Sequence, residues 1–191
     1  MYKHFFKRLL DLALSTLAII FLLVPMLLIS LLILITDPGP IFFKQKRFGR
    51  DRKMFNILKF RTMKVNTPDL PTDKLENPEQ YVTKIGKLLR KTSLDELPQI
   101  FNIFAGQMSF IGPRPALWNQ KRLISLRSKV HANDVRPGLS GWAQINGRDD
   151  ISESKKAKYD GEYIEKLSFP FDCRCFFGTF LKAFKGEGVK A

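Results

Sequence analysis

The sequence LALSTLAIIFLLVPMLLISLLILIT, residues 12–36, is 25 residues long and carries no charge. As an α-helix, this segment would extend roughly 37 Å at about 1.5 Å per residue. The hydrocarbon core of a bilayer is about 30 Å thick, so the segment is long enough to cross it. A cleaved signal peptide fits poorly, because the apolar run is too long and no A-x-A site follows it. The sequence therefore predicts a membrane anchor.

Pro25 lies near the middle of the anchor, where a proline removes one helical hydrogen bond and crowds the preceding turn. Both flanks are basic: Lys3, Lys7 and Arg8 precede the segment, and residues 44–64 contain nine basic residues and one acidic residue. Basic flanks favour the cytoplasmic side of a membrane. A helix broken at Pro25 that enters and leaves by the same face satisfies both flanks. The alternative is a single spanning helix kinked at Pro25, with the N-terminus outside.

The whole chain has 191 residues, which suits one domain plus an anchor, and a formal net charge of +14. This excess indicates an anionic partner, and composition alone leaves open nucleic acid, a membrane surface or a phosphorylated substrate. Cys173 and Cys175 are too close in sequence for an unstrained disulfide between them. With His4 and His131 as its only histidines, the chain has too few ligands for a zinc finger and is typical of a reducing compartment.

Beyond the anchor, the sequence predicts a mostly helical α+β fold with one β-hairpin. The hairpin is expected from two short apolar-containing runs, 41–48 and 54–63, around a turn. A proline-rich loop is expected at 65–80, and an irregular segment at 106–115, which ends in GPRP. Helices are expected at 81–90, 98–105, 116–131, 155–167 and 172–185.

The last expected helix carries a stripe of large apolar side chains: Phe176, Phe177, Phe180, Leu181 and Phe184. Together with Lys182 and Lys185, this stripe is typical of a helix that lies in a membrane interface. Packing of the same stripe against the protein core is the alternative.

Two adjacent carboxylates, Asp95 and Glu96, stand in the phrase TSLDELPQ at residues 92–99, directly after a basic stretch. Neighbouring cations favour an ionised carboxylate. An ionised aspartate can attack phosphorus, and a carboxylate pair can hold Mg²⁺ on a diphosphate. The structural alternative is a capping box, because Ser93 and Glu96 have its spacing, although Pro98 complicates that register.

A second group of candidate residues is basic and lies in or beside turns and strand ends: Lys59, Arg61, Arg114, Arg136 and Arg148. Guanidinium groups match phosphate oxygens bidentately, and lysine supplies a compact charge. A solvated surface position is the ordinary alternative for any single arginine. As a set beside two carboxylates, these residues predict a phosphate-binding site.

Six phrases run in order over nearly the whole chain: KRLLDL, DPGPIFFKQKRFG, FNILKFRTM, SLDELPQIFNIFAGQMSFIGPRP, VRPGLSGWAQINGR and YDGEYIEKLSFPFD. In combination they resemble the bacterial sugar transferases, the monotopic phosphoglycosyl transferases that begin glycan assembly on polyprenyl phosphate. The chain looks like the minimal catalytic form of that family.

The resemblance implies a re-entrant membrane anchor over residues 1–36 and a cytoplasmic, membrane-associated catalytic domain over residues 37–191. Amphipathic interfacial helices would surround a small catalytic domain at the bacterial inner membrane. Pro25 would be the membrane break. Relatives often have serine before this proline, where the present chain has Val24.

The resemblance also implies that Asp95 and Glu96 are the catalytic dyad and lie near Mg²⁺. The aspartate would attack the β-phosphorus of a nucleotide sugar, expected to be a UDP-sugar, and form a covalent phosphosugar intermediate as UMP leaves. Polyprenyl phosphate, such as undecaprenyl phosphate, would then attack that intermediate in the first membrane step of capsule, exopolysaccharide, O-antigen or glycoprotein assembly. Four basic residues fall on family motif positions and would bind phosphate: Lys59, Arg90, Arg114 and Arg148.

A membrane-anchored, non-enzymatic binder of anionic lipid or nucleic acid is the main alternative, because basic charge and aromatic side chains would serve either role. Such a tether needs neither the carboxylate pair nor the turns that combine glycine and arginine. A spanning, metal-dependent transferase without a covalent intermediate usually carries many apolar spans, and this chain has one. We therefore expect a nucleotide sugar, polyprenyl phosphate and the membrane as partners, and no nucleic acid. The sugar and any homo-oligomer are left open.

Overall fold

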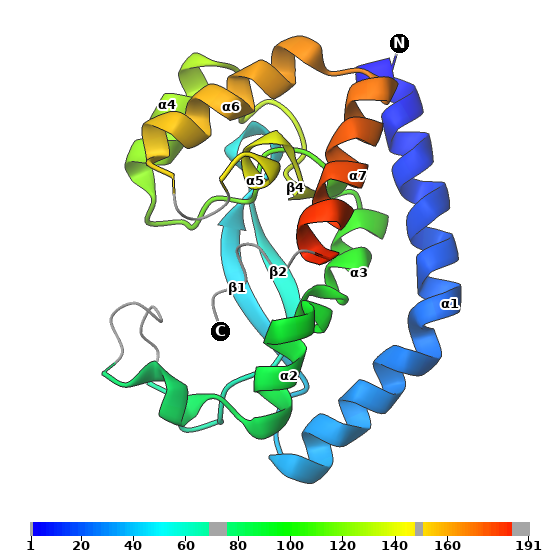
Figure 1. The fold of residues 1–191 in the computed structure, drawn as a ribbon, viewed down its shortest axis with the longest axis vertical. Coiled ribbons are helices and arrows are strands. Elements are labelled where there is room, and N and C mark those ends of the chain that lie inside the picture. The colour runs from blue at the N-terminus through cyan, green and yellow to red at the C-terminus, as the bar shows by residue number, and fades with distance from the viewer. Residues whose placement is uncertain (1, 69–75, 148–150, 185–191) are drawn as a thin grey trace.

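A computed structural model describes residues 2–68, 76–147 and 151–184 (Figure 1). A π-helical turn (Tyr2–Phe6) leads into one long helix, α1 (Lys7–Thr36), which runs along one side of the molecule. The other strands and α-helices of the described residues are β1 (Phe42–Phe48), β2 (Met54–Phe60), α2 (Lys84–Thr92), α3 (Gln99–Phe104), β3 (Ser109–Ile111), α4 (Lys121–Lys129), β4 (Gly138–Ser140), α5 (Trp142–Ile145), α6 (Glu153–Lys166) and α7 (Phe169–Phe184). Short 3-10 turns lie at Arg50–Arg52, Pro78–Tyr81 and Leu94–Glu96. The expected mostly helical α+β fold is confirmed.

Helix α1 is continuous through Pro25, and its ribbon changes direction partway along its length (Figure 1). A proline inside a helix is the ordinary cause of such a bend, since it removes a backbone hydrogen bond and crowds the turn before it. Pro25 thus lies inside α1 and does not interrupt it. Within the described residues, α1 is the one helix that is long and apolar enough to cross a membrane. Its buried residues are few and lie at spacings that favour one face: Asp11, Ser15, Met26 and Ile33.

The N-terminal end of α1 is bound to the folded body through Asp172 of α7, and Figure 1 shows these two segments side by side. Lys7 Nζ lies 2.6 Å from Asp172 Oδ2, and the Tyr2 hydroxyl donates to the same oxygen at 2.6 Å. From α6, the Tyr163 hydroxyl donates to Asp172 Oδ1 at 2.7 Å. Lys7 therefore belongs to an internal polar cluster, whereas the sequence had suggested a flanking charge.

Two further side chains on the first turns of α1 bind the same body. Arg8 donates to the carbonyls of Ile103 and Phe104, both at 2.8 Å, at the C-terminal end of α3, where a cation is favourable. Asp11 Oδ1 accepts a hydrogen bond from the Ser109 hydroxyl of β3 at 3.0 Å. The polar residues at the start of α1 thus face protein.

The C-terminal half of α1 packs on the base of the hairpin and on α2. One core cluster contains Met26, Ile33, Phe60 and Leu89. Directly after the helix, the backbone carbonyl and the carboxylate of Asp37 both lie beside the Arg61 guanidinium. Both ends of α1 therefore contact one folded body.

The predicted hairpin is confirmed as an antiparallel pair, with Phe42 opposite Phe60 and Phe48 opposite Met54. The prediction that residues 106–115 are irregular was wrong in part, because β3 in this segment pairs in parallel with β4, which lies 27 or more residues away in sequence. Parallel pairing over so few residues leaves no periodic signal to detect.

Several predicted helices begin at other residues than expected. Helix α4 starts at Lys121 and not at residue 116, because Ala116 accepts a hydrogen bond from Phe48 N at 3.0 Å and Leu117 pairs with β1. Helix α2 starts at Lys84, where the Thr83 hydroxyl caps it by accepting from Gly86 N at 2.9 Å. In both cases a tertiary or capping contact sets the boundary.

Helix α7 shows which way its apolar residues face. Phe171 and Cys175 are buried in the cluster around Tyr163, whereas Phe176, Phe177 and Leu181 are exposed. The core-packing alternative is thus wrong for these three exposed residues. The side chains of Phe180, Lys182 and Phe184, and all of Lys185, lie outside the described part of the chain.

Candidate active site

The carboxylate pair lies in a short 3-10 turn, Leu94–Glu96, between α2 and α3. Helix α2 ends at Thr92, and Ser93 adopts a left-handed conformation with φ of 57°, a common way to end a helix but one usually made by glycine or asparagine. Within the described residues the Ser93 side chain makes no capping hydrogen bond. The capping-box alternative is therefore wrong.

The leucines on either side of the pair fix the turn to the core. Leu94 and Leu97 pack against the cluster that contains Met26 and Ile33 of α1. Because these apolar neighbours point into the core, the carboxylates between them are held at a set place next to the bent apolar helix.

Lys59 of β2 links the two carboxylates. Its Nζ lies 2.7 Å from Glu96 Oε1 and 3.5 Å from Asp95 Oδ2. From the other side, Arg114 Nη2 lies 3.5 Å from Glu96 Oε1. The structure thus brings Lys59 and Arg114 to the dyad from segments that are far apart in sequence.

Arg90 approaches from the last turn of α2, and its Nε donates to the Thr62 hydroxyl at 3.0 Å. Burial lowers the pKa of Arg90, and the charge of Asp95 opposes that shift. The coupling between these two groups shows that Arg90 also belongs to the electrostatic surroundings of the dyad.

The pKa of Asp95 is raised above its ordinary value, chiefly by burial. Lys59 opposes this shift by charge and by hydrogen bonding, Glu96 adds to it, and Arg90 opposes it. The neighbouring cations favour the ionised carboxylate, as the sequence predicts, but the desolvation of Asp95 outweighs them. A raised pKa leaves the carboxylate more basic once it is ionised.

Two of the predicted basic residues are bound to backbone elsewhere. Arg61 binds Asp37 at the end of α1, and Arg136 Nε donates to the Gly106 carbonyl at 2.8 Å. Arg148 lies outside the described residues. Arg61 and Arg136 therefore hold loops in place. From the sequence alone, this role cannot be told apart from phosphate binding.

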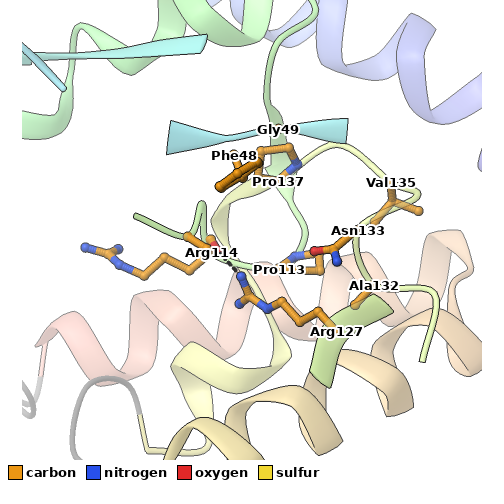
Figure 2. Close-up of a pocket in the computed structure, with 10 residues that line it drawn as sticks. Phe48, Gly49, Pro113, Arg114, Arg127, Ala132, Asn133, Val135 and Pro137 are labelled. Carbon is orange, nitrogen blue, oxygen red and sulfur yellow. Dashed lines mark hydrogen bonds between the residues drawn. The ribbon is translucent and has the colours of Figure 1, made fainter. Parts of the chain in front are cut away.

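The segment that carries Arg114 is packed too closely to admit a larger residue at Gly112. A Cβ at that position would lie 2.6 Å from the Arg136 carbonyl oxygen. Behind the segment, Arg127 lines a small hollow together with Pro113, Ala132 and Asn133 (Figure 2). The Arg114 side chain leaves this hollow, whereas its carbonyl accepts from Arg127 Nη1 at 2.8 Å.

Arg127, in the helix predicted at 116–131, was not among the residues that the sequence singled out. Its guanidinium is buried and binds Asp160 of α6. A signal was present: Arg127 follows Leu123 and Ile124, both buried, by four and three residues, so it lies on the apolar face of α4.

The donor set at the dyad suits Mg²⁺. In proteins this ion is commonly held by one or two carboxylates together with substrate phosphates and water. Asp95 and Glu96 supply two carboxylates, and among residues 2–68, 76–147 and 151–184 no cluster of three or more His, Cys, Asp and Glu side chains could hold a metal alone. Asp95 and Glu96 are thus carboxylates that could hold such an ion only together with further ligands.

The sequence profile of the bacterial sugar transferases matches residues 2–186. This chain belongs to the bacterial sugar transferase family. The predicted resemblance is confirmed.

Three curated relatives show how far the similarity extends. The chain is 38% identical over 190 residues to the UDP-glucose:undecaprenyl-phosphate glucose-1-phosphate transferase of Escherichia coli. This alignment covers 96% of the present chain and 41% of the Escherichia coli protein. The chain is 41% identical over 152 residues to the uncharacterized sugar transferase EpsL of Bacillus subtilis, and this alignment covers 80% of the present chain and 74% of EpsL. It is 36% identical over 188 residues to the exopolysaccharide production protein ExoY of Sinorhizobium fredii, and this alignment covers 91% of the present chain and 83% of ExoY. The chain thus spans about two fifths of the Escherichia coli relative.

Proposed function

We propose that this chain transfers a sugar 1-phosphate from a UDP-sugar to polyprenyl phosphate, and that this is a first membrane step of exopolysaccharide or related glycan assembly. The observation that carries the proposal is the carboxylate pair, which contacts Lys59 and Arg114 and is anchored by its flanking leucines against α1. A charged donor and a lipid-borne acceptor must meet at a membrane surface. A reactive dyad beside an apolar helix suits that meeting.

In the first step, an ionised Asp95 oxygen attacks the β-phosphorus of the donor. A bond forms between Asp95 and phosphorus, and the bond from phosphorus to the bridging oxygen breaks, so that UMP leaves with that oxygen. In the second step, an oxygen of polyprenyl phosphate attacks the same phosphorus and releases Asp95. The product is a polyprenyl diphosphosugar.

The basic residues make this attack feasible. Asp95 and the diphosphate are both anionic, so Lys59 and Arg114 reduce their repulsion and stabilise charge that develops on phosphate oxygens. Asp95 and Glu96 would hold Mg²⁺, which would supply neutralisation of charge on the departing phosphate. Lys59, Arg90, Arg114 and Arg148 are the proposed phosphate-binding residues.

We also propose that α1 enters and leaves the membrane by its cytoplasmic face. Support comes from its two ends, which bind one charged body through Asp172 and through Arg61. A spanning arrangement with the N-terminus outside would separate Lys7 from Asp172. The buried Asp172 carboxylate would then lose the cation that pairs with it, so this separation would be unfavourable.

The decisive experiment uses the detergent-solubilised protein with Mg²⁺ and a panel of UDP-sugars. We expect UMP release with one or more donors, and an intact-mass increase equal to one phosphosugar when acceptor is omitted. Asp95→Asn should show neither. Asp51→Asn is the matched control, because Asp51 is an exposed aspartate that pairs with Arg50. A fully active Asp95→Asn protein would exclude the covalent mechanism, and a wild-type protein that binds anionic lipid without releasing UMP would favour the non-enzymatic alternative.

A further inference from the structure

The loop that carries Arg114 is held through its backbone from three directions. Pro113 and Pro115 flank the arginine, and proline fixes φ and lacks an N–H group. The carbonyls of residues 113, 114 and 115 accept, in that order, from Gly138 N of β4 at 2.9 Å, Arg127 Nη1 of α4 at 2.8 Å and Arg47 Nη1 of β1 at 3.0 Å. The backbone from which the Arg114 side chain projects therefore has little freedom.

The central support is a buried ion pair. Arg127 Nε lies 2.7 Å from Asp160 Oδ2, and the two side chains are only 5% and 1% exposed. Burying an ion pair costs desolvation, and replacing such a pair by apolar residues of similar size is often neutral or stabilising. Stability alone thus gives little reason for charges at this place.

The geometry points to a second role: we infer that Arg127 and Asp160 are positioning residues, which aim Arg114 at the donor diphosphate by holding its carbonyl. Asp160 orients the guanidinium through Nε, which leaves Nη1 to donate to the Arg114 carbonyl. Figure 2 shows this carbonyl facing Arg127 while the Arg114 side chain extends the other way. This inference rests on the proposed transferase function.

The effect on catalysis follows from the reach of Arg114. Its Nη2 already lies 3.5 Å from Glu96 Oε1, so a small shift of the loop moves it in or out of hydrogen-bond range of a phosphate beside the dyad. A misplacement of about 1 Å in an active site can cost roughly a hundredfold in rate. Arg127 and Asp160 would therefore influence transfer without touching substrate.

The test replaces the ion pair by apolar residues of similar size, Arg127→Met together with Asp160→Leu, in the full chain. We expect the double variant to unfold in detergent at a temperature near that of the wild type, while kcat/KM for UMP release falls at least tenfold. Arg122→Met is the matched control, since Arg122 is an exposed arginine of the same helix. Arg127→Lys keeps the charge but cannot hold Asp160 and the Arg114 carbonyl in the same geometry, so its kcat/KM should also lie well below that of the wild type.

A double-mutant cycle with Arg114→Ala distinguishes positioning from a merely structural role. If Arg127 and Asp160 act through Arg114, their replacement in the Arg114→Ala background should change kcat/KM by less than threefold. Losses that multiply would overturn the inference, as would a double variant with wild-type kcat/KM. Absence of UMP release by the wild type would instead overturn the proposed function, and the inference with it.

Discussion

At the scale of single residues, the dyad combines opposed influences on one carboxylate. Burial raises the pKa of Asp95, while Lys59 and Arg90 act to lower it. Both influences favour a nucleophile. The nearby cations keep a sufficient fraction of Asp95 ionised at the working pH, and burial leaves the ionised carboxylate poorly solvated and therefore more basic. Lys59, which lies 2.7 Å from Glu96 and 3.5 Å from Asp95, is the cation best placed to maintain that balance.

The raised pKa predicts an acid limb in the pH profile of kcat/KM. Activity requires ionised Asp95, so kcat/KM should fall as the pH drops through a midpoint above the ordinary value of 3.8. Arg90→Gln removes a charge that favours ionisation, so the midpoint should move to higher pH. Lys87→Gln, at an exposed position of the same helix, should leave it in place. A midpoint that does not move in Arg90→Gln would show that the two groups are not coupled.

The phosphate-binding assignments predict unequal effects of removing arginines. Arg114→Ala and Arg148→Ala should lower kcat/KM by roughly ten- to a hundredfold, because a charged hydrogen bond contributes about 1.5–3 kcal/mol. Arg52→Ala and Lys129→Ala serve as controls, since the structure exposes both side chains. Equal and small effects in steady-state kinetics of all four variants would contradict the assignments.

At the scale of elements, the turn between α2 and α3 depends on the left-handed conformation of Ser93. This residue ends α2 and sets the direction in which the 3-10 turn presents the dyad. Non-glycine residues adopt this conformation only at a cost, which is largest for β-branched side chains.

Substitutions at Ser93 should therefore follow backbone preference and not side-chain hydrogen bonding. Ser93→Gly should keep the thermal stability and UMP release of the wild type. Ser93→Val should destabilise the protein by about 1–2 kcal/mol and reduce activity, because it strains the turn that holds the dyad. Thermal unfolding in detergent and UMP release provide the two measurements. Equal behaviour of the glycine and valine variants would show that the turn tolerates either.

At the scale of the whole molecule, α1 is attached at both ends, and large apolar side chains between them, such as Phe21 and Val24, are exposed. Its N-terminal turns bind α3, β3 and α7, and its second half packs on the hairpin and α2. Helix α1, which contains Pro25, changes direction between these attachments (Figure 1). The bend lets one helix follow the body on which the dyad sits.

Topology can be tested with an impermeant thiol reagent on whole cells. The reporter is Lys3→Cys in a background without Cys173 and Cys175; Lys3 is exposed, whereas Tyr2 would lose its bond to Asp172. The wild-type helix should leave the reporter unlabelled. Pro25→Leu restores a continuous backbone hydrogen-bond pattern, and a detectable fraction should become labelled because the N-terminus carries few charges. Labelling of the reporter with Pro25 intact would mean that the helix spans, and re-entry would then be wrong.

The apolar helix, the hairpin, the mostly helical body and the carboxylate pair could all be predicted from the sequence. These features are local: a run of apolar residues, a turn between two strands and two adjacent acids can be recognised without knowing what packs against them. Even the family could be inferred, because its phrases are contiguous.

The roles of the individual charged residues, in contrast, became clear from the folded structure. Lys59, Arg61, Arg114 and Arg136 look alike in sequence, yet two contact the dyad and two hold loops. Arg127 and Asp160 are 33 residues apart and meet only because α4 packs on α6. The pairing of β3 with β4 likewise depends on segments that are distant in sequence. A charge acquires its role from its burial and its partners, and both are set by packing between segments that are remote in sequence.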